Sequence, residues 1–157
     1  MVYGQGMDPV HGDLYAGELV KGPGKILYAD QSENALLLGA DAKFAIGVSA
    51  GDSSRGADGA LESTGATVAY YPLGGVLMVQ SAYDQTYKPG MIVYAGANGL
   101  ALDSQDSSEK KLGIYVGHNP TAAATAALVV NGAGESGATE GEMILVNTAF
   151  AEAGQNA

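Results

Sequence analysis

The chain has 157 residues, which suits one domain or two very small ones. Its 17 acidic residues outnumber 7 basic ones, and the formal net charge of −10 argues against binding to a nucleic-acid backbone or an anionic membrane surface. The absence of cysteine excludes disulfides, thiolate catalysis and cysteine-ligated zinc. With 24 glycines and only 15% charged residues, the composition favours a turn-rich β protein.

Short apolar runs, each bounded by Gly, Pro, Asp, Asn or Ser, predict β-strands along the whole chain. The expected strands are residues 25–29, 35–38, 44–48, 67–71, 76–79, 91–95, 112–116, 128–130 and 143–146. Asn98-Gly99 indicates a type I′ hairpin turn. No amphipathic helix is evident, and residues 121–127 are left open as one or two helical turns. The fold class is therefore a small all-β barrel or sandwich.

The chain resembles itself when it is shifted by 66 residues. Pro23-Gly24 falls on Pro89-Gly90, Tyr28 on Tyr94 and Gly47 on Gly113; 10 of the 36 pairs from 16/82 to 51/117 are identical. The same shift places residues 77–79 on residues 143–145. Chance similarity in a chain rich in glycine and alanine is the alternative. We interpret the pattern as two duplicated β units that share one core, because about 65 residues are marginal alone.

This interpretation divides the chain into four parts. Residues 1–14 are an extended N-terminal arm, expected to order only against a partner. Residues 15–83 and 84–149 are the two β units, and residues 150–157 are a loose C-terminal tail. We find no basic-then-apolar leader and no run of 18 apolar residues, so a protein made in the cytosol is the simplest expectation.

Candidate chemical motifs are weak. Residues 132–137 match G-x-G-x-x-G, but only 20 residues follow and they hold a further strand, so we interpret them as a glycine-rich loop. His11 and His118 are the only histidines and lack metal-ligand spacing. The oxygen-rich residues 103–109 lack the spacing of a calcium loop and are expected to form a hydrated hairpin tip. We expect no catalytic residue, cofactor or metal, and therefore no enzyme.

Tyrosines surround the junction of the two units: Tyr70, Tyr71, Tyr83 and Tyr87. Tyrosine is favoured at protein interfaces because it combines a large apolar body with a polar tip. Ordinary strand tyrosine is the alternative.

The repeated pattern is Pro-Gly-x-apolar-apolar-Tyr, followed by apolar-Gly-apolar and then Gly-x-apolar-x-apolar. It occurs in residues 23–28, 45–50, 74–79, 88–94 and 112–117. In this pattern the chain resembles the small decoration, or cement, proteins of tailed-virus capsids, over roughly residues 14–148. It departs from them by a longer N-terminal arm and a long loop at residues 49–66.

The resemblance implies a non-enzymatic virion protein on the outer capsid surface. Such a protein binds the major capsid protein and itself, often as a homotrimer at threefold or quasi-threefold positions. The residues expected to contact the capsid or a neighbouring copy are Tyr3, Met7, Pro9, Tyr70, Tyr71, Tyr83 and Tyr87.

Three other functions stay open. The chain could be a β-sandwich binding module, such as an adhesin or a carbohydrate-binding domain, although it lacks the tryptophan that usually stacks on sugars. It could be another virion part, such as a tail or fibre subunit. An enzyme on a small β-barrel is the third, but no motif supplies its active site.

Overall fold

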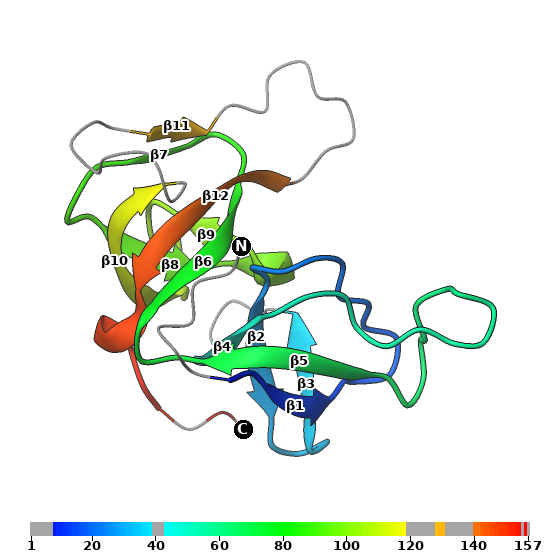
Figure 1. Ribbon diagram of the computed structural model, residues 1–157. Helices are drawn as coiled ribbons and strands as arrows, with labels where there is room; N and C mark the ends of the chain where they lie inside the picture. The colour runs from blue at the N-terminus through cyan, green and yellow to red at the C-terminus, as the bar shows by residue number, and fades with distance from the viewer. Residues whose placement is uncertain (1–7, 39–42, 119–127, 131–139, 155, 157) are drawn as a thin grey trace.

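The computed structural model describes residues 8–38, 43–118, 128–130, 140–154 and 156, and every structural statement below concerns these residues. The protein is almost entirely β (Figure 1). Its strands are β1 (Val10–Asp13), β2 (Ile26–Asp30), β3 (Ala35–Leu38), β4 (Ala45–Ser49), β5 (Thr67–Pro72), β6 (Val76–Ala82), β7 (Gln85–Tyr87), β8 (Ile92–Ala95), β9 (Ala101–Leu102), β10 (Lys110–His118), β11 (Leu128–Val130) and β12 (Glu140–Asn147).

All nine strands predicted from the apolar runs are present, and the all-β fold class is confirmed. Three short strands, β1, β7 and β9, were not predicted. In the described ranges the helices are two three-residue 3-10 turns, η1 (Ala97–Gly99) and η2 (Thr148–Phe150), and neither could cross a membrane. At the predicted hairpin turn, Asn98 and Gly99 both have positive φ, 59° and 73°, as a type I′ turn requires.

Ten of the twelve strands form two five-stranded sheets with the same order, and β7 and β11 pair as a separate two-stranded sheet. The first sheet runs β1-β5-β4-β2-β3, and the second is a closed barrel in which β6, β12, β10, β8 and β9 follow one another. The barrel closes where β6 and β9 pair in parallel at Ser81 and Ala101. The first sheet is not a closed barrel, but an isolated parallel bridge between Leu14, just after β1, and Leu36 of β3 joins its two edges at the matching place. For this reason we call the two sheets the first and second barrels.

Strand register shows that the barrels are copies of one unit. In the first, Ile26 pairs with Val48 and Leu27 with Gly47, after which the register slips at Ile46. In the second, Ile92 pairs with Ile114 and Val93 with Gly113, and the register slips at Leu112. Every one of these positions differs by 66 residues, and the bulge recurs at the same place. The predicted duplication is thus confirmed, with Gly47 and Gly113 equivalent.

Outside this central part the predicted offset is wrong. Residues 77–79 and 143–145 are not equivalent: β6 and β12 are neighbours that pair with each other. The counterpart of β12 is β5, with an offset of 76, because Val48 pairs with Tyr71 and its equivalent Ile114 pairs with Asn147. The counterpart of β6 is β1, with an offset of 67, because Val10 lies opposite Tyr70 and Leu77 lies opposite Val146.

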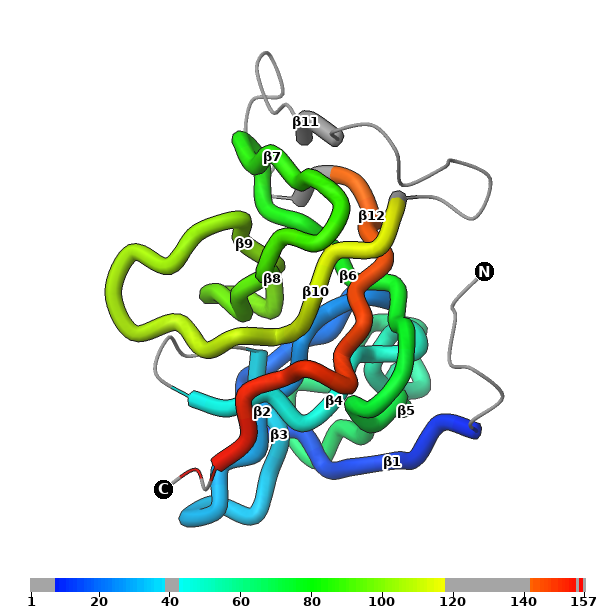
Figure 2. The backbone as a smooth tube through the Cα atoms, turned by 90° about the vertical axis from the view of Figure 1, so that its left-hand side faces the viewer, coloured from blue at the N-terminus to red at the C-terminus, as the bar shows by residue number. Residues whose placement is uncertain are grey.

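The equivalence of β1 and β6 changes the predicted boundaries. The first unit runs from β1 through β5 and the second from β6 through β12, so the last residues of the predicted arm form a sheet strand. The predicted loose tail is also partly anchored, beside the first barrel (Figure 2). Asn156 is buried, its side-chain amide donates to the Phe44 carbonyl at 2.8 Å, and its amide oxygen accepts from the Phe44 N–H at 2.8 Å.

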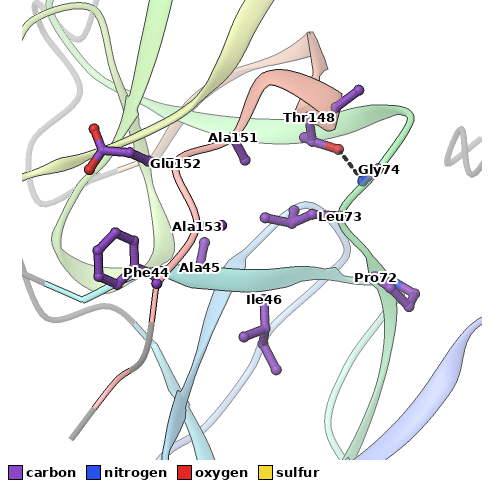
Figure 3. Close-up of a pocket in the computed structure, with 12 residues that line it drawn as sticks. Phe44, Ala45, Ile46, Pro72, Leu73, Gly74, Thr148, Ala151, Glu152 and Ala153 are labelled. Atoms are coloured by element: carbon purple, nitrogen blue, oxygen red, sulfur yellow. Dashed lines mark hydrogen bonds between the residues drawn. The ribbon is translucent and has the colours of Figure 1, made fainter.

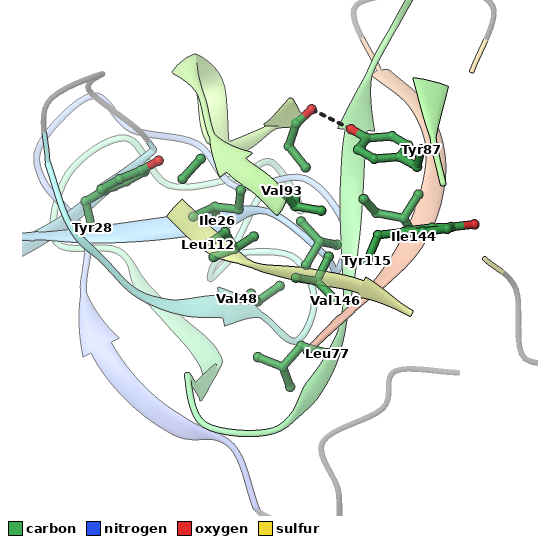
Figure 4. Packing of buried hydrophobic residues seen from close by; sticks show 13 residues of the cluster. Ile26, Tyr28, Val48, Leu77, Tyr87, Val93, Leu112, Tyr115, Ile144 and Val146 are labelled. Atoms are coloured by element: carbon green, nitrogen blue, oxygen red, sulfur yellow. Dashed lines mark hydrogen bonds between the residues drawn. The ribbon is translucent and has the colours of Figure 1, made fainter. Parts of the chain in front are cut away.

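The buried residues form two clusters, and the larger of them is shared by the two units. The first core contains Leu14, Val20, Leu27, Leu36, Ala66 and Val68. The second is larger and contains inward residues of the second barrel, including Val93, Leu112, Ile144 and Val146. Ile26, Tyr28 and Val48 of the first unit join this second core (Figure 4).

Candidate functional site

The structure separates the tyrosines that were predicted to form one contact surface. Tyr87 is fully buried in the second core, and its ring stacks on Tyr115 with centroids 5.5 Å apart. Its hydroxyl donates to the Ala101 carbonyl at 3.1 Å and lies 2.7 Å from the Ser81 hydroxyl. Burial raises the pKa of Tyr87. Tyr87 is therefore a core residue, and its prediction as a contact residue is wrong.

The remaining predicted contact residues are dispersed. Tyr70 and Tyr71 lie half-buried on β5, and Tyr70 packs against the first core while Tyr71 packs against the second. Tyr83, half-buried, also packs against the second core. Pro9 is exposed directly before β1, and Tyr3 and Met7 lie outside the described residues. The described side chains of this set pack against different cores, so spacing in the sequence was a poor guide to a shared surface.

The second barrel instead exposes large apolar side chains that sequence reasoning did not single out. Ile92 on β8 is 40% exposed, Val116 on β10 is 37% exposed and Phe150 on η2 is 55% exposed. They come from neighbouring elements, because β10 pairs with β8 and packs against η2. The missed signal was the alternation along β10, where Ile114 and Val116 both fall on the outward face. Large apolar side chains exposed on neighbouring elements make this side of the second barrel a candidate surface for meeting another protein.

A pocket of about 430 Å³ lies between the first barrel and the C-terminal segment (Figure 3). Its lining is mostly apolar: Phe44, Ala45, Ile46, Pro72, Leu73, Ala149, Ala151 and Ala153. Thr148 braces one wall, since its hydroxyl donates to the Gly75 carbonyl at 2.6 Å and accepts from the Gly74 N–H at 3.0 Å. Lys110 Nζ lies 4.9 Å from the centroid of the Phe44 ring. This pocket could hold an apolar side chain of a partner.

The acidic side chain of Glu109 stabilises the turn at residues 103–109. Glu109 is buried, and its carboxylate accepts from the N–H groups of Ser107 at 2.8 Å and Asp106 at 3.1 Å, which lowers its pKa. The predicted hydrated tip at residues 103–109 is thus closed by a carboxylate that faces inward. Within the described ranges, no three His, Asp or Glu side chains come together as metal ligands. His11 is exposed on β1, and the segment 132–137 lies outside the described residues.

The two barrels meet where residues 24–26 of the first unit enter the second. Gly24 O accepts a hydrogen bond from the Gln80 N–H of β6 at 2.8 Å, and Tyr28 Oη donates to the Gly96 carbonyl at 3.3 Å. Gly99 lies against the backbone of Ile26, so closely that a Cβ there would be 2.9 Å from Ile26 O. The absence of a side chain at Gly99 thus permits the contact.

Comparison with known protein families, curated proteins and solved structures finds no match to this chain. The resemblance to capsid decoration proteins therefore stays a prediction.

Proposed function

We propose that this protein decorates and stabilises the outer surface of a tailed-virus capsid by binding the lattice of the major capsid protein. The role is structural and needs no catalysis or cofactor. The repeated Pro-Gly and apolar-Gly-apolar motifs support it, and they now correspond to equivalent strands and bulges of two barrels. The protein would act in the virion, after synthesis in the host cytoplasm.

The observation that carries the proposal is the exposure of large apolar side chains on the second barrel. Phe150 and Val116 are exposed on adjoining elements of a protein with few charged residues. Desolvating such side chains against a partner favours association by roughly 25 cal/mol per Å² of apolar area removed from water. The net charge of −10 is compatible with a position outside the shell, where the protein does not compete for the packaged nucleic acid.

The test uses heads of the virus that encodes this chain, prepared without the protein. Purified protein is mixed with the heads, which are then sedimented. We expect saturable co-sedimentation and a loss of about tenfold or more in affinity for Phe150→Asp, because the substitution places a charge in an apolar contact. Leu19→Asp, at a residue 39% exposed on the first unit, is the matched control. Protein that stays in the supernatant at all concentrations would contradict the proposal.

A further inference from the structure

Duplication gives the molecule two copies of the segment that joins its barrels. The inner plug is residues 24–26, and the outer plug is the equivalent residues 90–92. Both have the same local geometry. In the inner plug, Gly24 N donates to Ser49 O at 2.9 Å and Ser49 N donates to Lys25 O at 2.8 Å. The outer plug has the equivalent bonds: Gly90 N donates to Tyr115 O at 3.1 Å, and Tyr115 N donates to Met91 O at 2.9 Å. The φ angles of Gly24 and Gly90 are 89° and 85°.

Only the inner plug is covered. Ile26 is fully buried in the second barrel, and Figure 4 shows it beside Val93 and Leu112. Its equivalent, Ile92, is 40% exposed. The strand partners of the two isoleucines differ in the same way. Val48, which pairs with Ile26, is fully buried, and Ile114, which pairs with Ile92, is partly exposed. The outer plug therefore has the same backbone geometry as the inner plug, but no barrel of the same chain covers it.

The inner plug occupies a seam of the second barrel between β6, at Gln80, and the β8–β9 turn, at Gly96 and Gly99. The equivalent seam of the first barrel lies between β1, at Asp13, and the β2–β3 turn, at residues 30–34. Here the structure has an open pocket of about 270 Å³. Its lining includes Gly12, Asp13, Ala29, Leu36, Ile46 and Tyr70.

The lining of this open seam corresponds to the occupied one. Asp13 is equivalent to Gln80, Ile46 to Leu112 and Tyr70 to Val146. Leu14 N donates to Ala66 O beside β5, and Tyr15 N donates to Leu36 O on the opposite edge. Since alternate N–H groups of a strand point to opposite edges, the Asp13 N–H points toward the seam, as the Gln80 N–H points toward Gly24.

We propose that the outer plug of one molecule inserts into the open seam of a second copy, repeating between molecules the contact that joins the two barrels within one. Ile92 takes the place of Ile26 and packs against Leu36 and Ile46 in the pocket, and Gly90 O accepts from the Asp13 N–H. Exposed Lys88 flanks the plug, and the acidic side chains of Asp13 and Glu33 lie at the seam. Opposite charges at these flanks favour the pairing.

The contact joins two different surfaces and is therefore head-to-tail. Such contacts close into rings or continue as filaments, depending on the rotation between copies. The proposal does not rest on capsid binding, because both surfaces belong to this chain. It assigns the surface of self-association to residues 90–92 and to the seam beside Asp13, away from the tyrosines predicted from the sequence.

The first test is sedimentation equilibrium of the purified full chain over a wide concentration range. We expect a mass above the monomer that grows with concentration. Ile92→Asp should weaken the association about 100-fold or more, because it would bury a charge against Leu36 and Ile46 and beside the acidic side chains of Asp13 and Asp30. Leu19→Asp, which changes an equally exposed residue outside both surfaces, should associate like the unmodified chain. Circular dichroism and thermal melting confirm that each variant is folded.

The second test identifies the contacting surfaces. The chain has no cysteine, so Glu33→Cys and Ile92→Cys each introduce one thiol. These positions correspond to Gly99 and Ile26, which touch within one chain. One variant carries a longer affinity tag, and we expect the mixture to form a disulfide-linked species of intermediate mass on oxidation. Equal or greater cross-linking within each variant alone would contradict the head-to-tail contact.

A monomeric mass at every concentration overturns the proposal, as does an oligomer that Ile92→Asp leaves intact. A monomer whose binding to capsids is abolished by Ile92→Asp would assign the plug to the capsid subunit instead. That result would overturn self-association but support the proposed function. An oligomer that does not bind capsids would support self-association and overturn the proposed function.

Discussion

Gly113→Ala is expected to destabilise the protein by about 3 kcal/mol, and Gly47→Ala by a similar amount. A Cβ at position 113 would fall on the backbone carbonyl of Asn147 and 2.8 Å from Val146 Cγ1. A Cβ at position 47 would lie 2.6 Å from Tyr71 O. In both barrels the obstructing atoms belong to the neighbouring strand of the sheet, which cannot move aside without breaking its pairing. The two substitutions therefore test equivalent positions.

Gly51→Ala is the matched control, because no atom lies within 4 Å of a Cβ built there. Surface substitutions of this kind change the free energy of unfolding by about 0.5 kcal/mol or less. Urea unfolding of the three variants measures the difference. If Gly113→Ala and Gly47→Ala unfold at the urea concentration of Gly51→Ala, the close approach of strands in both barrels is wrong.

Ile26→Ala should cost about 2–5 kcal/mol of stability, whereas the equivalent Ile92→Ala should cost less than about 1 kcal/mol. The two isoleucines occupy the same place in the repeat, and their strand partners, Val48 and Ile114, are also equivalent. Ile26 is fully buried between the barrels and Ile92 is 40% exposed. The difference therefore measures the burial that the second barrel provides, with local strand propensity held constant.

Thermal melting monitored by circular dichroism gives the comparison, at a protein concentration at which the chain is monomeric. Equal losses at the two positions would mean that the contact between the barrels does not stabilise the fold. A larger loss for Ile92→Ala would contradict the burial of Ile26 in the second core.

The strands were predictable because each apolar run ends at a turn residue. Pro23-Gly24 and Pro89-Gly90 could also be matched by sequence, since both glycines need positive φ. Gly47 and Gly113 were recognisable for a steric reason: a side chain at either position would strike the adjacent strand. The centre of the repeat therefore kept its sequence because the backbone geometry there tolerates few residues.

The outer strands of each unit could not be matched in this way. Val10-His11-Gly12-Asp13 has little in common with Leu77-Met78-Val79-Gln80, because inward positions of a barrel accept any apolar side chain that fills the space. Gly12 leaves room for Leu36 and Tyr70, while its neighbourhood in the second barrel is filled by larger residues of β6. A longer connection between β10 and β12 also shifts the offset from 66 to 76.

The proposed contact surface was the least predictable feature. Tyrosine is a residue type favoured at interfaces, but Tyr87 points inward, where its hydroxyl bonds to Ser81 and to the Ala101 carbonyl. Ile92 looks like a core residue because its equivalent, Ile26, is one. Which of two equivalent residues is exposed depends on how the units pack, and that information is absent from the local pattern.

The first unit begins at β1, as the second begins at β6. Thermal melting of two truncated chains tests this, one chain lacking residues 1–8 and the other lacking residues 1–13. The second deletion removes β1, the partner of β5, and uncovers the first core beside Val68 and Leu36. We expect the chain lacking residues 1–13 to melt at least about 10 °C below the chain lacking residues 1–8, or not to fold. Equal melting temperatures would show that residues 10–13 are a dispensable arm and would contradict the two-barrel account.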